Sequence, residues 1–425
     1  MLRPSCIWIL LICKTACLYA QDKTYARRIV NDLCSEQFAG RGYVKNGGQK
    51  TADYIKKEFE QIGIKSFEKG YFQSYGFPAV AFNGAVEVVV EGRELMPGED
   101  YIVSPGFPKV NGVFDLVFVD SSTIDNPTEW KEFKKKALYK TFIVVDAIKS
   151  KKFNQQANAN AVLNNELKAR GLVFANQEKL IWGASSSWDR FPILYFSKGS
   201  LKRHVQQLTL NVEPELIQYQ AKNVIGFIRG HLYPDSFIVY TAHYDHLGMM
   251  GPWAFFPGAN DNASGIAMLL DMAKHYAKTK PAYSIAFIAF SGEEIGLFGS
   301  YYYTQNPIFP LSQIALLINL DLMGTGDKGM TCVNATAFPV DFEELQMLNL
   351  TGNYLVSVTP RSNAQNSDHY FFAEKGIRAF YFYLMGEYKY YHDVYDTADM
   401  LTFSRYNEAF SLIKDFSEAY QQRYR

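Results

Sequence analysis

The sequence is poor in cysteine. Five of its 425 residues are cysteines, and Cys6, Cys13 and Cys17 all lie within the first twenty positions. Only Cys34 and Cys332 remain in the rest of the chain, so a disulfide-rich scaffold and a zinc site built from cysteines are both excluded. A single bridge between Cys34 and Cys332 and two free buried thiols are equally compatible with the sequence.

The sequence also lacks an excess of charge and a long apolar run. Lysine and arginine together number 43, as do aspartate and glutamate, so the formal net charge is zero. This balance gives no reason to expect nucleic acid or an anionic membrane surface as a partner. No apolar run reaches the roughly 20 residues that a membrane-spanning helix needs, so we expect no stable membrane insertion. The oligomeric state has no signature in the sequence.

The first twenty residues have the pattern of a secretory signal peptide. Arg3 precedes an apolar stretch over residues 6–13, and the small residue Ala20 stands where a signal peptidase would cut. Lys14 interrupts the apolar region, which is the one imperfect feature of the pattern. We therefore expect residues 1–20 to be removed and the mature protein to be secreted or periplasmic.

The pattern of apolar and polar residues changes twice along the remaining chain, which predicts three parts. Residues 21–79 contain two helical patterns, "YARRIVNDLCS" and "GGQKTADYIKKEFEQIGI". Residues 80–215 hold short β-branched or aromatic runs separated by turns, such as "AVEVVVEG", "TFIVVDA" and "KLIWGAS", and this predicts a mostly β insert. Residues 216–425 alternate apolar runs with amphipathic segments, which is typical of an α/β domain with a doubly wound, mostly parallel sheet flanked by helices.

Potential metal ligands follow the ends of these apolar runs. They are His243 and Asp245 after "SFIVYTA", Glu293 and Glu294 after "SIAFIAF", Asp321 after "IALLINL", and His392 in the loop after "RAFYFYL". Asp261 precedes the predicted helix "NASGIAMLLDMAKHYAK". Because functional groups in open α/β sheets gather beyond the carboxyl ends of the strands, we expect these side chains to converge.

The chemistry of this set favours a pair of metal ions. Two imidazoles and three carboxylates suit two zinc ions that share one bridging carboxylate and activate a water. Such a water needs a base that is not itself a ligand, and the doublet Glu293 and Glu294 can supply a base and a ligand, because consecutive side chains diverge. Asp245 is placed to accept the imidazole N–H of His243. Cobalt or manganese would suit much the same ligands.

Six motifs stand in a fixed order over residues 220–400: "AHYDHLG", "PGANDNASG", "AFSGEEIGLFGS", "NLDLMG", "SDHYFFAEKGI" and "YYHDVYDT". In order and spacing they resemble the secreted di-zinc aminopeptidases of the bacterial leucyl aminopeptidase and aminopeptidase Y type. Their zinc exopeptidase fold, which is phosphorylase/hydrolase-like, is shared with transferrin-receptor-like proteins and glutaminyl cyclases. Residues 22–75 resemble the N-terminal helices of the family, and residues 80–215 weakly resemble its protease-associated domain.

The resemblance implies a ligand set for two zinc ions per chain. Asp261 would bridge the two ions. Glu294 and His392 would complete the site of one ion, and His243 and Asp321 would complete the site of the other.

The resemblance also implies catalytic roles around these ligands. Glu293 would act as general base, Asp245 would orient His243, and Tyr391 would help to stabilise the oxyanion. The family often has a cis peptide bond after its bridging aspartate, so we expect one between Asp261 and Asn262. Peptides would be hydrolysed by a water that the metals activate.

Four further polar residues lie in or beside the motifs. His246 is expected beside the metal ligands or facing the substrate. Asp368 and His369 lie in a motif that supports the cleft in the family, and Asp396 is expected to be a structural hydrogen-bond partner near His392.

The leading interpretation is a secreted zinc aminopeptidase acting on peptides. A glutaminyl cyclase uses one zinc ion, and the five-ligand set argues against it. A non-catalytic binding module would have lost ligands, and none is missing here. A carboxypeptidase or dipeptidase of the same fold stays open, as does the role of the insert, which would either shade the cleft or be passive.

Overall fold

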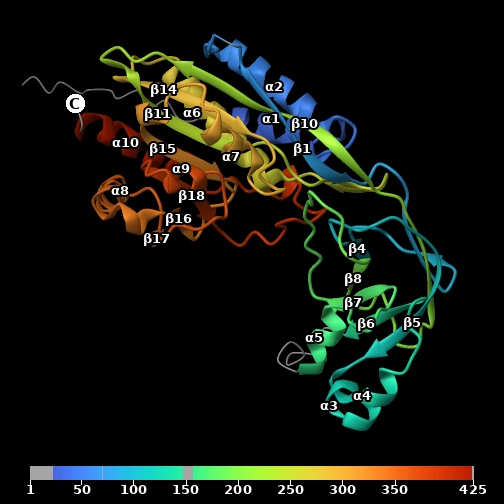
Figure 1. The fold of residues 1–425 in the computed structure, drawn as a ribbon. Coiled ribbons are helices and arrows are strands. Elements are labelled where there is room, and N and C mark those ends of the chain that lie inside the picture. Colours follow the sequence, from blue (N-terminus) through green and yellow to red (C-terminus); the bar gives the residue numbers. More distant parts are fainter. Residues whose placement is uncertain (1–22, 69, 147–156, 424–425) are drawn as a thin grey trace, which may run out of the picture.

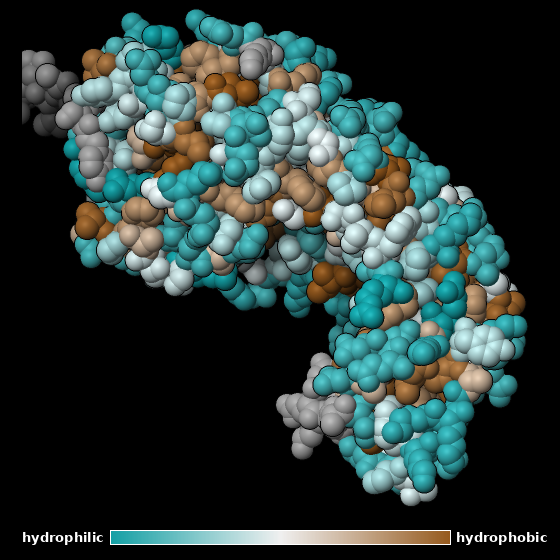
Figure 2. Space-filling model, viewed as in Figure 1, coloured by the Kyte–Doolittle hydropathy of each residue, from teal (hydrophilic) through white to brown (hydrophobic). Residues whose placement is uncertain are grey.

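The chain forms a larger and a smaller body, each built on its own sheet, in the computed structural model (Figure 1). The structure describes residues 23–68, 70–146 and 157–423. The predicted signal peptide, residues 1–20, lies outside these ranges. Figure 2 shows that the molecule is bent, with one side hollowed where the two bodies meet. None of the helices within the described ranges is long and apolar enough to cross a membrane.

Two helices open the described chain, as the sequence predicts. Helix α1 (Lys23–Leu33) and helix α2 (Gly47–Ile62) are joined by the 3-10 segment η1 (Glu36–Arg41). Gly63 ends α2 with φ of 88°, and its N–H donates to the carbonyls of Phe59 and Glu60. Cys34 and Cys332 are both free, so the bridge that the sequence left open does not form.

The larger body contains an eight-stranded sheet in the order β1-β10-β14-β11-β15-β18-β16-β17. Its strands are β1 (Phe72–Ala81), β10 (Glu215–Ile228), β11 (Tyr233–His243), β14 (Tyr283–Phe290), β15 (Ile314–Asp321), β16 (Gly329–Val333), β17 (Val358–Arg361) and β18 (Ala379–Met385). The four central strands, β14, β11, β15 and β18, are parallel. Antiparallel neighbours flank them, so the sheet as a whole is mixed. The predicted α/β class is confirmed, with parallel pairing concentrated in the centre.

Helices cover both faces of this sheet. The helices are α6 (Ser264–Tyr276), α7 (Phe298–Gln305), α8 (Pro339–Gly352), α9 (Tyr370–Glu374) and α10 (Tyr406–Arg423), with short turns η5 (Leu311–Gln313), η6 (Ala335–Ala337) and η7 (Ala398–Met400). Along β11, Ile238 and Tyr240 pack with α1, α2, α6 and α10, whereas Phe237 and Val239 pack with α7 and α9. This alternation is what a strand covered on both faces requires.

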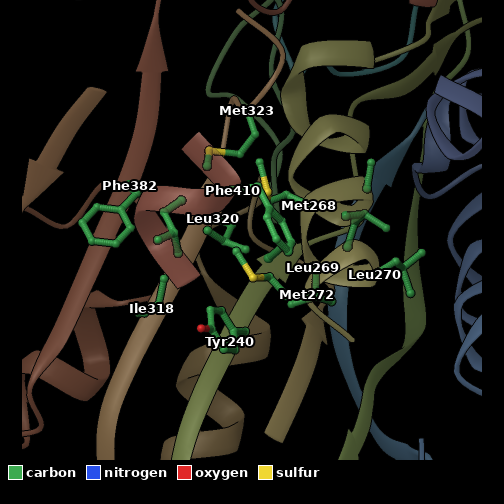
Figure 3. Close-up of a cluster of buried hydrophobic side chains, with 14 of the residues drawn as sticks. Tyr240, Met268, Leu269, Leu270, Met272, Ile318, Leu320, Met323, Phe382 and Phe410 are labelled. Carbon is green, nitrogen blue, oxygen red and sulfur yellow. The ribbon is translucent and has the colours of Figure 1, made fainter. Parts of the chain in front are cut away.

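Figure 3 shows part of the larger core, where α6 and α10 meet the sheet. The labelled side chains are Tyr240, Met268, Leu269, Leu270, Met272, Ile318, Leu320, Met323, Phe382 and Phe410. All are 5% exposed or less, and burying one large apolar side chain contributes about 1.5–3 kcal/mol. The core therefore holds the ends of β11 and β15, which carry the candidate site, in fixed positions.

The smaller body lies within residues 80–215, which we call the insert. Its sheet has the order β3-β2-β9-β5-β6-β7-β8-β4. The strands are β2 (Val86–Val90), β3 (Arg93–Glu94), β4 (Tyr101–Val103), β5 (Val110–Val119), β6 (Thr141–Asp146), β7 (Gly171–Gln177), β8 (Ile193–Ser197) and β9 (Gln207–Val212). Helices α3 (Ser121–Asp125), α4 (Pro127–Phe133) and α5 (Ala157–Leu163) accompany the sheet. The run "KLIWGAS" is not a strand, because residues 178–185 follow an irregular path. The domain boundaries at residues 80 and 215 stay a prediction.

A small hairpin joins the two bodies. Strands β12 (Gly248–Met250) and β13 (Ala254–Phe256) pair antiparallel in the segment after β11. Met250 and Phe256 are buried in the same apolar cluster as Val103 and Trp182 of the insert. The core of the insert is therefore continuous with the larger body.

Arg41 ties the N-terminal segment to the loops after β11 and before α6. Its side chain is fully buried. Its guanidinium donates to five backbone carbonyls: Tyr244 (2.9 Å), Leu33 (3.2 Å), Pro257 (2.5 Å), Gly258 (2.6 Å) and Asp261 (3.2 Å). One side chain thus satisfies acceptors from three separate segments.

Replacing Arg41 with Met is expected to lower the free energy of unfolding by about 3 kcal/mol, because it leaves buried carbonyls without a donor. Urea denaturation of the metal-free proteins measures the change. Arg93→Met is the matched control, since Arg93 pairs with Asp100 at an exposed site, and its effect is expected to stay below about 1 kcal/mol. An Arg41→Met variant that unfolds at the wild-type urea concentration contradicts the prediction.

Candidate metal centre

The structure brings all the sequence-predicted site residues together at the carboxyl ends of the parallel strands. His243 ends β11 and Asp321 ends β15. Asp245 lies two residues after His243, and the pair Glu293 and Glu294 comes shortly after β14. Asp261 lies in the short π-helix η4 (Ala259–Ala263) before α6, and Tyr391 and His392 lie in the loop after β18. The strands fix where each side chain starts, and the loops turn the side chains toward one another.

The first group of potential ligands consists of His243, Asp261 and Asp321. Nε2 of His243 lies 3.4 Å from Oδ1 of Asp261 and 3.5 Å from Oδ1 of Asp321. Oδ2 of Asp321 accepts a hydrogen bond from Ser367, but its Oδ1 is buried without a hydrogen-bond partner. A buried carboxylate oxygen that faces a histidine and a second carboxylate suits a cation, so this group fits zinc.

The second group lies on the other side of Asp261. Nε2 of His392 is 3.2 Å from Oδ2 of Asp261 and 3.0 Å from Oε2 of Glu294. The two oxygens of Asp261 therefore face different histidines, His243 and His392. This is the arrangement that a bridging carboxylate between two zinc ions needs.

His246 also reaches the second group. Its Nδ1 lies 2.6 Å from Oε1 of Glu294, and its side chain is fully buried. Together with Asp261 and Glu294 it satisfies the distances of a metal-binding group. Nε2 of His392 contacts both carboxylates, whereas Nδ1 of His246 contacts one oxygen of Glu294 and its Nε2 is buried without a hydrogen-bond partner. Both histidines therefore lie within reach of a cation at this group.

The two neighbouring glutamates have opposite electrostatic environments. Burial, together with the carboxylates of Glu294 and Asp368, raises the pKa of Glu293 well above its ordinary value. Burial alone would also raise the pKa of Glu294, but the imidazoles of His392 and His246 lower it to about 2. Such a divergence separates a group that can hold a proton near neutral pH from one that stays ionised.

Asp245 connects these glutamates to the N-terminal segment. Its carboxylate accepts the backbone N–H of Glu293 (3.2 Å) and of Glu294 (3.4 Å), and the hydroxyl of Tyr43 (3.0 Å). Nδ1 of His243 lies 3.1 Å from the backbone carbonyl of Asp245 and 3.8 Å from its carboxylate. The nearer partner of the imidazole is therefore the carbonyl. Tyr43 lies 202 residues from Asp245 in sequence and belongs to none of the motifs.

The backbone around Asp261 is held by the side chain of Asp396 and by that of its own neighbour, Asn262. The peptide bond between Asp261 and Asn262 is cis, as expected. The carboxylate of Asp396 accepts the backbone N–H of Asn260 (2.8 Å) and of Asp261 (3.1 Å). The side chain of Asn262 donates to the carbonyl of Leu320 at 3.1 Å. Asp396 thus connects the loop that carries His392 to Asp261, which lies between the two groups of potential ligands.

Tyr391 covers the second group from the solvent side. Its ring stacks on that of His392, with centroids 3.9 Å apart and planes 14° apart, and it is 47% exposed. Burial and the surrounding carboxylates raise the pKa of Tyr391, so its hydroxyl keeps its proton. Asp368 and His369 are fully buried and belong to neither group, and burial raises the pKa of Asp368 to about 7.

Comparison with known proteins gives one family and a set of relatives. Residues 223–417 match the model of Peptidase family M28. A probable zinc metalloprotease of Pyricularia oryzae is 37% identical over 111 residues, which cover 25% of this chain and 22% of that protein. The aminopeptidase YwaD of Bacillus subtilis is 31% identical over 160 residues, which cover 36% of this chain and 34% of that protein. The matched segments thus span about a third or less of the length of these relatives.

The fold extends much further than these segments. The crystal structure of BSAP, a zinc aminopeptidase from Bacillus subtilis, superposes with a TM-score of 0.70 at 19% identity, and the match covers 94% of this chain and 95% of that one. The shared architecture therefore includes the insert as well as the larger body.

Proposed function

Because residues 223–417 belong to Peptidase family M28, we propose that this chain is a secreted zinc aminopeptidase that hydrolyses N-terminal residues from peptides. The observation that carries the proposal is the position of Asp261. Its two carboxylate oxygens lie 3.4 Å from His243 and 3.2 Å from His392. Secretion rests on the predicted signal peptide, and the aminopeptidase activity is supported by the relatives that carry that name.

The donor set fits two zinc ions. His243 and Asp321 would hold one ion, Glu294 and His392 would hold the other, and Asp261 would be shared. When bound, the ions supply polarisation of the scissile carbonyl and a lowered pKa of a water molecule.

The residues of the chain supply the proton transfers. Glu293 takes the proton of the attacking water on its carboxylate and passes it to the leaving amine. Asp245 positions Glu293 through its backbone N–H, and the hydroxyl of Tyr391 donates a hydrogen bond to the developing oxyanion.

The proposal is tested with aminoacyl anilides that have either a free or an acetylated amino group. We expect the purified mature chain to cleave only the free-amine substrates, to lose activity when a chelator removes the metal, and to regain it when zinc is added back. A chain that instead cleaves N-blocked peptides from their carboxyl end is a carboxypeptidase. A chain that cyclises N-terminal glutamine without peptidase activity is a glutaminyl cyclase.

A further inference from the structure

The insert reaches the second group of ligands through the segment after β7. The backbone N–H of Trp182 donates to the carbonyl of His392 at 3.2 Å. In return, Nδ1 of His392 lies 2.8 Å from the carbonyl oxygen of Trp182. A carbonyl oxygen only accepts hydrogen bonds, so Nδ1 carries a proton. In the neutral imidazole the lone pair is then on Nε2, the nitrogen that faces Asp261 and Glu294. The insert therefore sets both the tautomer and the orientation of this imidazole.

Lys179, which lies shortly before Trp182 in the insert, also binds the loop that carries His392. Its Nζ donates to the carbonyl of Lys389 at 2.6 Å and to the carbonyl of Tyr391 at 2.7 Å. These carbonyls flank Tyr390 and stand directly before His392. The loop over residues 386–397 has no helix or strand of its own, so its conformation depends on contacts from outside.

The contact points in the insert are firmly anchored. Trp182 is 4% exposed, and its indole N–H donates to the carbonyl of Val103 at 3.0 Å. Its ring stacks on Phe256 of the hairpin, with centroids 4.7 Å apart. A second loop of the insert also approaches closely, since a Cβ added at Gly98 would lie 2.6 Å from Cγ1 of Val394.

We propose that the insert is a working part of the metal centre, and that Lys179 and Trp182 are positioning residues for the ligand His392. The inference rests on the proposed function, because it assumes that His392 binds zinc. Ligating histidines are usually held by a hydrogen bond from their other ring nitrogen, and loss of such a partner costs about 10–100-fold in metal affinity or activity. In this chain the partner comes from a separate body. The ion held by His243 and Asp321 depends on strands of the larger sheet instead.

The test is Lys179→Met, which removes two hydrogen bonds to the loop and leaves every ligand in place. We expect one of two zinc ions to bind about tenfold more weakly and the other to bind as in the wild type, measured by titration against a zinc-chelating dye. The value of kcat is expected to fall while KM stays unchanged, because the contacts of Lys179 are with the loop that carries His392. Lys179→Arg keeps a cationic donor and is expected to restore most of the affinity.

The matched control is Lys198→Met. Lys198 also lies on the insert, and its ion pair with Glu178 is exposed, so we expect wild-type zinc binding. Zinc affinities of Lys179→Met that equal those of the wild type at both sites overturn the inference. If Lys179→Met does not fold, the zinc affinities of Trp182→Phe are measured instead, because this variant loses the hydrogen bond to Val103. One weakened zinc site supports the inference, and two sites of wild-type affinity overturn it. If the wild-type chain binds two zinc ions but cleaves no aminoacyl anilide, the proposed activity is wrong. The zinc affinities of Lys179→Met and the wild type still decide whether the insert positions His392.

Discussion

Replacing Glu293 with Gln is expected to lower kcat by about 10³-fold while both zinc ions stay bound. Glutamine has the shape of glutamate but cannot accept the proton of the attacking water. The backbone N–H of Glu293 keeps its hydrogen bond to Asp245, so the turn after β14 is preserved. The loss should therefore fall on the chemical step, and KM should change little.

Two measurements separate a base from a metal ligand at this position. Steady-state kinetics on a free-amine substrate give kcat, and elemental analysis of the same samples gives zinc per chain. Glu132→Gln is the matched control, because Glu132 forms an exposed ion pair with Lys135, and it is expected to behave as the wild type. A zinc-loaded Glu293→Gln variant that keeps more than a tenth of the activity contradicts the role of Glu293, and a variant that loses zinc assigns it to the metal.

The larger sheet and its helices could be predicted because their sequence patterns are local. The runs "SFIVYTA", "SIAFIAF", "IALLINL" and "RAFYFYL" fall in β11, β14, β15 and β18, the parallel strands at the centre of the sheet. Strands buried on both faces are apolar throughout, so they are recognisable without knowledge of their partners. Polar residues that follow such strands lie at the common edge formed by the carboxyl ends of the strands.

Strand β1 shows where a local pattern fails. Its sequence, "FQSYGFPAVA", contains Gly76 and Pro78, which disfavour a strand. The structure tolerates them because β1 is the edge of its sheet, where the missing N–H of a proline removes no hydrogen bond from a second neighbour. Whether a strand is central or at the edge is decided by the tertiary fold, so the sequence could not reveal it.

The residues that orient the site residues could not be predicted from the sequence, because their contacts also depend on the tertiary fold. Tyr43 and Trp182 act on Asp245 and His392 across 202 and 210 positions of sequence. Arg41 acts largely on backbone carbonyls, which exist in every residue and leave no pattern. Motifs identify the groups that carry the chemistry, whereas the contacts that orient those groups come from distant segments and depend on the fold.

Replacing Asp261 with Asn is expected to weaken both zinc sites at once, by more than about 100-fold each. That figure is the upper end of what the loss of an orienting partner costs, and Asp261 is placed to contact both metals directly. Asparagine keeps the size of the side chain and the backbone hydrogen bond to Asp396, but it offers one oxygen where aspartate offers two. It also removes the negative charge that would offset the repulsion between two divalent ions.

Asp321→Asn is the comparison that makes this prediction specific, because Asp321 faces only the group of His243. Zinc titrations should show one weakened site in Asp321→Asn and two in Asp261→Asn, with activity lost in both variants. Asp321 has a buried oxygen without a hydrogen-bond partner, so its substitution tests a single ion in an otherwise intact site. If Asp261→Asn retains one site of wild-type affinity, the two oxygens of Asp261 do not serve two metals, and the dinuclear centre on which the proposed activity depends is wrong.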